Sequence, residues 1–358
     1  MAHAYTPGLK VTKRMTHSVT RMLPIKGEVS VAVGDAVSAD QVVAATYMPG
    51  DVFPLNMANL LAVPPKDVVE LMLQKEGDAI KEGEPLAQTA GIFGKFKKIH
   101  NSPYTGTVET ISDVTGQVIL RGPDIPVEVK AYMTGTVTEV TPEVGCVVES
   151  EVAFVQGIFG IGGETCGEIR FAVDTCDCTL TASDITSDMK GCIVIGGARI
   201  TDDAIEAARA AGVAAIVGGG MDDQDLKEFL GYDLGVAITG SEKKGISVIM
   251  TEGFGDIAMA SRTFDLLKSF EGNEASVNGA TQIRAGVMRP EIIIPIESDA
   301  SKGESDQEGG YLEIGKTLRI IRDPYFGILG TVKSLPSEPH VLGSGSKARV
   351  LEVELHHP

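Results

Sequence analysis

The sequence predicts a multidomain protein that combines α/β and β parts, and three observations point to this fold class. The first half repeats short β-branched runs around glycine turns, the second half alternates apolar runs with helical segments, and an acidic low-complexity stretch precedes the C-terminal region. A chain of 358 residues is long enough for two or three domains of about 100–200 residues each. With 42 glycines and no tryptophan, we expect cores of Val, Ile and Ala.

The charge of the chain is unevenly distributed. The net charge is −18, from 49 acidic and 31 basic residues, which favours solubility and disfavours non-specific binding to nucleic acid or anionic membranes. Residues 1–26 are the exception, because they contain five basic residues and no acid, and we predict a basic N-terminal arm there. A solvated or strand-adjoining terminus is the simpler interpretation. The basic residues are Lys10, Lys13, Arg14, Arg21 and Lys26.

The sequence also predicts the compartment. No stretch approaches the roughly 18 uninterrupted apolar residues of a membrane span, and the N-terminus lacks the apolar core of a signal peptide. Five cysteines are an odd number, which argues against a secreted disulfide framework. We therefore expect a cytoplasmic protein that has no membrane partner.

The first half contains a repeated turn motif. Three segments share a central glycine followed by a polar or small residue and an apolar strand start, at residues 33–37, 76–80 and 144–148. Glycine permits the positive φ that such turns need, and β-branched residues suit the strand that follows. We predict one β domain over residues 27–175, with a helical insertion near residues 64–74 where a proline pair precedes apolar residues at helical spacing.

Two segments resemble the turns of biotinyl- and lipoyl-type carrier domains. They are Ser102-Pro103-Tyr104-Thr105-Gly106-Thr107-Val108 and Gly77-Asp78-Ala79-Ile80-Lys81-Glu82-Gly83. The resemblance covers about residues 24–170 and implies a barrel-sandwich hybrid fold. Carrier domains attach their prosthetic group to a lysine some eight residues before the Pro turn, where this chain has Lys95. Because Lys95 lacks the Met-Lys-Met or Asp-Lys context of those families, we expect an unmodified domain without a cofactor.

Residues 176–296 are predicted to form a three-layer α/β domain with a mainly parallel sheet. Apolar runs at residues 192–197, 213–217 and 235–238 alternate with helical segments at residues 201–211 and 222–230. A longer helix is expected to end near Phe270, and residues 291–296 form a further strand.

Glycines are expected at the carboxyl ends of these strands, where open α/β sheets bind ligands and helix N-termini attract anions. Tight connections between the strands and helices explain the same glycines equally well. A second segment, residues 278–286, places hydrogen-bonding side chains between small residues, and a structural loop is the simpler interpretation there too. The candidate ligand-binding residues are Gly197, Gly219, Gly220, Thr251, Glu252, Gly253, Gly255, Asn278, Gln282 and Arg284.

Metal binding and catalysis have little support in the sequence. Cys176 and Cys178 form a Cys-x-Cys pair, but a zinc site needs two more ligands and no second close pair of Cys or His is nearby. No Ser-His-Asp or Cys-His arrangement can be identified from spacing. We therefore predict no metal and name no catalytic residue.

Residues 297–310 are predicted to be an acidic linker, and residues 311–358 a separate module. Gly315-Lys316-Thr317-Leu318-Arg319-Ile320-Ile321 and the segment at residues 324–332 resemble the KOW motif of ribosomal proteins and elongation factors, which implies an SH3-like barrel. The loop with Arg322, Tyr325 and Phe326 is the expected contact for RNA or protein. Six basic and five acidic residues in the module are too balanced for strong phosphate attraction.

Taken together, these patterns predict a non-catalytic scaffold or adaptor with a protein partner and an undetermined oligomeric state. The first alternative is an enzyme or a ligand- or phosphate-binding protein that uses the glycine loops. The second alternative is a factor associated with RNA or with transcription and translation, through the KOW-like module and the basic arm.

Overall fold

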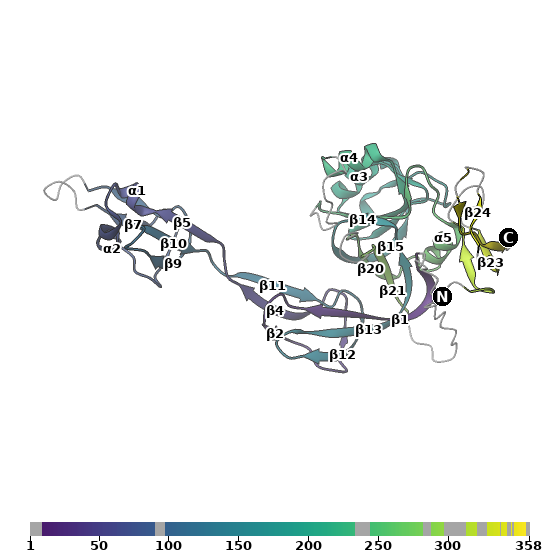
Figure 1. The fold of residues 1–358 in the computed structure, drawn as a ribbon, viewed down its shortest axis with the longest axis horizontal. Helices are drawn as coiled ribbons and strands as arrows, with labels where there is room; N and C mark the ends of the chain where they lie inside the picture. The colour runs from purple at the N-terminus through teal and green to yellow at the C-terminus, as the bar shows by residue number, and fades with distance from the viewer. Residues whose placement is uncertain are drawn as a thin grey trace.

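The computed structural model describes residues 9–89, 97–232, 244–281, 288–296, 313–320, 328–336, 338–341, 345 and 347–355. The protein is rich in strands and has few helices, and its largest sheet has 12 strands of mixed direction. Figure 1 shows three units in a row, which we name the tip unit (residues 51–121), the middle unit (residues 23–50 and 122–149) and the α/β body (residues 152–296). A small C-terminal sheet lies beside the α/β body.

The α/β body contains the centre of the largest sheet. Its strands are β14 (Phe159–Ile161), β15 (Glu164–Phe171), β16 (Ile193–Ile195), β17 (Arg199–Ile200), β18 (Ala215–Met221), β19 (Ser247–Phe254), β20 (Glu274–Asn278) and β21 (Glu291–Pro295). The spatial order is β14-β19-β18-β16-β15-β20-β21, and β17 pairs with β18. The pairs among β15, β16, β18 and β19 are parallel, whereas the pairs of β14, β20 and β21 are antiparallel.

The prediction of a mainly parallel sheet is therefore right for the centre and wrong for the flanks. A strand that is buried on both faces has the same apolar run in parallel and in antiparallel pairing. The sequence pattern therefore does not reveal which of the two it adopts. The predicted strand at residues 235–238 lies outside the described residues.

Helices cover both faces of this sheet, as Figure 1 shows. Those of the body are α3 (Asp202–Ala211), α4 (Asp223–Leu230), α5 (Ser261–Lys268) and the 3₁₀ helices η2 (Ala182–Asp184) and η3 (Ser187–Met189). Ile205 of α3 and Leu226 of α4 share one core cluster with Val194, while Leu267 of α5 shares the other with Ile193. Because neighbouring strand residues point to opposite faces, β16 supplies both cores and the body has three layers.

The middle unit is joined to the α/β body by two long strands. It contains β2 (Glu28–Val29), β3 (Ala36–Val37), β4 (Val42–Met48), β11 (Ile125–Lys130) and β12 (Gly135–Thr141), and it shares β1 (Val11–Met22) and β13 (Gly145–Gln156) with the body. Residues 145–149 of β13 pair with β12, residues 152–156 pair with β21, and β1 pairs along β13 from end to end. Residues 11–22 of the predicted basic arm therefore form a strand of the largest sheet.

The tip unit has a core of its own. Its elements are β5 (Val52–Asn56), α1 (Met57–Leu61), η1 (Pro65–Asp67), α2 (Val68–Leu71), β6 (Ala79–Ile80), β7 (Pro85–Gln88), β8 (Ile99–Asn101), β9 (Gly106–Ile111) and β10 (Gln117–Arg121). The predicted helical insertion corresponds to η1 and α2. The core of the tip unit, with Met57 and Leu120, is distinct from that of the middle unit, with Val43 and Val148. Residues 27–151 therefore contain two cores in a row, and residues 152–175 belong to the α/β body.

A narrow neck connects the tip unit to the middle unit (Figure 1). The two chain segments touch there, because the Gly122 amide donates to the Asp51 carbonyl at 2.8 Å. A Cβ on Gly50 would lie 2.3 Å from the Gly122 oxygen, so only glycine allows this approach.

The predicted turn repeat is present twice, once in each of these units. Gly34 and Gly77 have φ of 95° and 91°. The following carboxylate caps each turn: Asp35 Oδ2 accepts from the Ala32 amide at 2.8 Å, and Asp78 Oδ2 accepts from the Lys75 amide at 2.7 Å. The two turns therefore share one hydrogen-bond pattern.

The third predicted copy of the turn is wrong. Gly145 lies inside β13, between Met22 of β1 and Thr141 of β12, and the residue with positive φ is Glu143, at 62°. A Cβ on Gly145 would lie 2.0 Å from the Arg21 carbonyl oxygen. This glycine permits close pairing of strands instead of a turn.

The described residues of the C-terminal region form two small antiparallel sheets. Their strands are β22 (Thr317–Arg319), β23 (Leu329–Ser334), β24 (His340–Val341), β25 (Lys347–Ala348) and β26 (Glu352–Leu355). The order β22-β23-β26 makes one sheet, β24 pairs with β25, and Val332 of β23 is buried.

Candidate functional site

The predicted glycine loops meet at one edge of the sheet. Residues 196–197 follow β16, residues 218–220 lie in the second half of β18, and residues 253–255 end β19, so all three are at the carboxyl ends of parallel strands. The Gly219 amide donates to the carbonyls of Gly197 and Ala198, at 3.0 and 2.8 Å. The sequence correctly placed these glycines beside one another, because parallel strands end at the same edge.

The space at this edge is occupied by the chain itself. A Cβ on Gly197 would lie 2.4 Å from the Thr175 carbonyl oxygen, and one on Gly219 would lie 2.2 Å from the Ile257 carbonyl oxygen. A Cβ on Gly220 would likewise lie 2.5 Å from the Gly255 carbonyl oxygen. These glycines allow backbone segments to pack on the sheet edge, which is the tight-connection interpretation of the motif.

Thr251 and Glu252 are also used within the fold. The buried Thr251 hydroxyl donates to the Gly218 carbonyl at 3.2 Å. Glu252 Oε1 accepts from the Ala260 amide at 3.0 Å, immediately before α5, where a carboxylate stabilises a helix N-terminus. Glu252 therefore fixes the start of α5 relative to the sheet, while Thr251 links β19 to β18.

A turn with two thiols lies over the same edge. The turn at residues 175–178 is closed by the Cys178 amide, which donates to the Thr175 carbonyl at 3.3 Å. The carbonyl of Cys176 accepts from the Met259 amide, and that of Cys178 accepts from the Ala198 amide. Cys176 Sγ is 3.7 Å from the hydroxyl of Ser261, the first residue of α5. The sequence showed the Cys-x-Cys pair but not its position beside α5.

Asn278 lies at the opposite edge of the sheet. It is the last residue of β20 and pairs with Glu164, the first residue of β15, and its Oδ1 accepts from the Ala280 amide at 2.9 Å. Because β20 runs antiparallel to β15, its carboxyl end is on the side where the parallel strands begin. The structure therefore separates Asn278 from the glycine loops, and Gln282 and Arg284 lie outside the described residues.

A polar cluster joins the middle unit to the α/β body. Both terminal nitrogens of Arg21 donate to the Glu164 carboxylate, at 2.8 and 2.7 Å. The Tyr132 hydroxyl donates to Glu291 Oε1 at 3.2 Å, and the Arg21 guanidinium lies 5.4 Å from the Tyr132 ring centre. Tyr132 is buried with a φ of 72°, a strained conformation for an aromatic residue. No sequence motif indicated this cluster.

Burial dominates the acid–base properties of the cluster. Burial, together with the nearby Glu291 carboxylate, raises the pKa of the Tyr132 hydroxyl well above its ordinary value. Burial also raises the pKa of Glu291, although the hydrogen bond from Tyr132 acts in the opposite direction. Desolvation therefore outweighs the hydrogen bond at this carboxyl.

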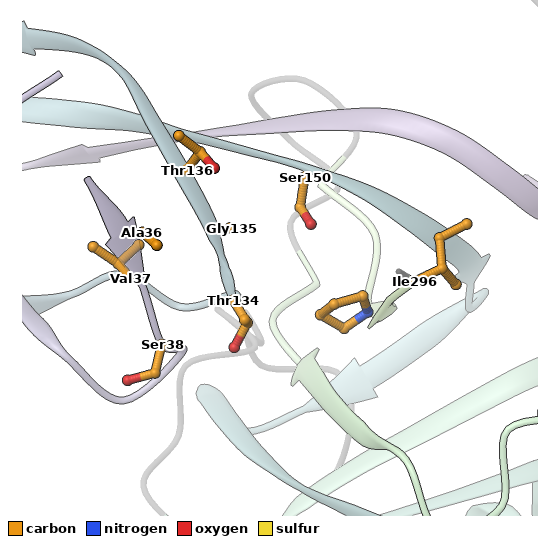
Figure 2. A pocket seen from close by; sticks show the side chains of 9 residues that line it. Ala36, Val37, Ser38, Thr134, Gly135, Thr136, Ser150 and Ile296 are labelled. Carbon is orange, nitrogen blue, oxygen red and sulfur yellow. The ribbon is translucent and has the colours of Figure 1, made fainter. Parts of the chain in front are cut away.

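A hollow of about 510 Å³ lies close to this cluster, and Figure 2 shows its lining. The hollow opens beside β13, between residues 145–149, which pair with β12, and residues 152–156, which pair with β21. Ser150 lies between these two paired stretches and lines the hollow. Hydroxyls and small apolar groups line it, and no charged side chain is among them. The lining residues are Ala36, Val37, Ser38, Thr134, Gly135, Thr136, Ser150, Pro295 and Ile296.

Three basic residues of the arm pair with acids of the same chain. Arg14 pairs with Glu151, and Lys26 Nζ is 2.8 Å from the Glu143 carboxylate. Arg21 belongs to the polar cluster described above. These contacts reduce the positive charge that β1 offers to a nucleic acid.

Several sequence predictions cannot be placed. Lys95, Arg322, Tyr325 and Phe326 lie outside the described residues, as does the acidic linker at residues 297–310. Within the described residues, no group of three or more His, Cys, Asp or Glu is arranged to hold a metal ion. None of the helices described combines the length and apolar composition that a membrane crossing requires.

Comparison with known proteins gives no match: no protein-family model, no curated protein and no solved structure matches the chain.

Proposed function

We propose that this protein is a non-catalytic adaptor that binds a partner protein through its tip unit. The observation that carries the proposal is the position of the tip unit, which is held away from the α/β body on a two-segment neck (Figure 1). A unit with its own core on such a neck contributes nothing to the core of the body. We propose that the tip unit projects from the body because it is presented to a partner protein.

The tip unit offers a mixed apolar and basic surface, which we call the tip surface and define as Leu60, Lys97, Lys98 and Ile99. Lys98 Nζ donates to the Leu60 carbonyl at 3.5 Å, so α1 and β8 adjoin here. Leu60 is 38% exposed and Ile99 is 52% exposed. Exposed apolar side chains beside lysines, on a chain of net charge −18, favour a partner segment that combines apolar and acidic residues.

The glycine loops support the adaptor in preference to the enzyme. Backbone of the same chain packs against Gly197, Gly219 and Gly220, the Gly219, Gly220 and Gly255 amides donate to carbonyls of the chain, and Glu252 anchors the start of α5. A phosphate cradle needs amides that point toward a ligand. We accordingly propose that these loops are structural.

We also propose finer assignments for the parts of the chain. The matched turns at Gly34 and Gly77 support a barrel-sandwich unit in both the middle unit and the tip unit. The antiparallel order β22-β23-β26 supports a KOW-type, SH3-like module at the C-terminus. Five free cysteines support a cytoplasmic location.

Capture of partners from the native source tests the adaptor. Full-length protein is immobilised, and the proteins that it retains are compared with those retained by Leu60→Asp/Ile99→Asp. The control is Val33→Asp, because Val33 is 64% exposed in the middle unit. We expect at least one partner that the wild type and the control retain and that the double variant binds about tenfold more weakly or worse, since buried interface anchors carry most of the binding energy. Equal retention by all three proteins contradicts the proposal.

A further inference from the structure

The five cysteines fall into two groups. Cys146 and Cys192 are buried and Cys166 is half-buried, and burial raises the pKa of all three thiols, which makes them less reactive. Cys178 is exposed and Cys176 is half-buried, two residues apart on one turn. Only this pair combines two neighbouring thiols with access to solvent.

The turn that carries the pair is fixed in place. The Cys176 carbonyl accepts from the Met259 amide at 3.1 Å, and the Cys178 carbonyl accepts from the Ala198 amide at 2.7 Å. Gly197 lies beneath the turn, where a Cβ would be 2.6 Å from the Cys178 oxygen. The backbone of the turn is thus held on the sheet edge. The Cys178 side chain is exposed and the Cys176 side chain packs partly against the core cluster that contains Met259, so the two cysteines are carried two residues apart on one fixed turn.

The two thiols have different surroundings. Cys176 Sγ lies 3.7 Å from the hydroxyl of Ser261, the first residue of α5. Cys178 Sγ lies 3.0 Å from Thr175 Oγ1, and the Thr175 hydroxyl donates to Asp177 at 2.6 Å. Because that hydroxyl has one proton, its oxygen accepts from the Cys178 S–H. The Cys178 S–H is therefore engaged in a hydrogen bond to Thr175, and we assign the first attack to Cys176.

We propose that Cys176 and Cys178 of the α/β body form a dithiol that reduces accessible disulfides by exchange, an activity in addition to the adaptor role of the tip unit, which itself involves no catalysis. The Cys176 thiolate attacks one sulfur of a disulfide RSSR, the RS–SR bond breaks, and RS⁻ leaves and takes a proton from water. Cys178 then loses its proton and attacks Cys176 Sγ of the mixed disulfide, which forms the Cys176–Cys178 bond and releases the second RS⁻. The protein loses two electrons and RSSR gains them; a thiol reductant in the medium restores the dithiol. This activity is independent of partner binding at the tip surface.

The test uses the full-length reduced protein and glutathione disulfide as the probe. Intact mass and peptide mapping are expected to show a loss of two hydrogens within the peptide that contains both cysteines. Cys178→Ser is expected to stop at a mixed disulfide of Cys176 with one glutathione. Cys176→Ser is expected to react about tenfold more slowly or worse, because the attacking thiolate is gone. The control variant Cys166→Ser should react like the wild type, and thermal unfolding of each variant confirms that it folds.

Three results would overturn the proposal. One is a wild-type protein that gains glutathione without forming the internal disulfide. Another is oxidation at Cys166 or another cysteine in place of the pair. The last is a Cys176→Ser variant, folded as judged by its thermal transition, that reacts at the wild-type rate.

Discussion

Gly219 illustrates, at the scale of one residue, how the sheet edge is closed. Its φ is outside the positive region, so its requirement is purely steric: a Cβ would meet the Ile257 oxygen at 2.2 Å and the Met259 nitrogen at 2.6 Å. We expect Gly219→Ala to lower the free energy of unfolding by about 2–3 kcal/mol, because backbone atoms cannot move aside as a flexible side chain would.

Urea denaturation measures this loss, and Gly163→Ala is the matched control. Nothing lies within 4 Å of a Cβ on Gly163, which is exposed. The control should change stability by less than about 0.5 kcal/mol. Equal effects of the two substitutions would show that the sheet edge is not closed by backbone packing.

Glu291 gives the junction a pH dependence. Since burial raises its pKa in the folded state, the protonated carboxyl is favoured there, and its contribution to stability is present at low pH and lost as the pH rises through the folded pKa. Glu291→Gln copies the neutral form and can still accept from Tyr132. We expect the stability of Glu291→Gln relative to wild type to increase between about pH 4.5 and pH 8.

Thermal unfolding at several pH values measures this trend. Glu139→Gln, at an exposed position of β12, controls for the loss of one carboxylate charge. A difference between Glu291→Gln and wild type that stays constant with pH, or shrinks as the pH rises, would contradict the role assigned to burial.

At the scale of elements, the two matched turns test whether the middle and tip units are built alike. Asp35 and Asp78 each cap a turn through one amide, at 2.8 and 2.7 Å. Replacing either with Ala is expected to cost about 1 kcal/mol, the usual net value of such a hydrogen bond. The costs should add in the double variant, because the turns belong to different cores.

Denaturant unfolding of the two single variants and the double variant gives these values. Strong non-additivity would show that the two turns interact energetically and that their units are not independent. An effect of Asp35→Ala alone would show that the second turn is not stabilised by its carboxylate.

At the scale of the whole molecule, the neck predicts that the tip unit can be removed. Its two segments touch at Gly122 and Asp51, so residues 51–121 can be excised and Gly50 rejoined to Gly122 through two added glycines. We expect the shortened protein to keep a cooperative thermal transition for the α/β body, because the tip core is separate from it.

Differential scanning calorimetry before and after excision tests this independence. It also shows whether a loss of partner capture after excision comes from unfolding of the body or from removal of the tip surface. A shortened protein that aggregates or unfolds without a cooperative transition would show that the body depends on the tip unit. A folded shortened protein that still captures the same partner would move the binding surface away from the tip.

The sequence by itself determined the local features of this protein, because their causes lie within a few residues. Asp202 and Asp203 favour the start of α3 and Gly212, with φ of 77°, ends it. The turns at Gly34 and Gly77 follow from glycine and the aspartate beside it. The position of the glycine loops at one sheet edge also follows from the alternation of strands and helices.

Only the tertiary structure decided what those features contact, because pairing partners lie far apart along the chain. It divided residues 27–175 among the tip unit, the middle unit and the α/β body, placed Gly145 at the start of β13, and set Asn278 at the edge opposite the glycine loops. It also packed backbone against Gly197, Gly219 and Gly220, and it brought Cys176 beside Ser261, 85 residues away. Apolar runs and glycines are compatible with several pairings, and long-range hydrogen bonds and packing select among them.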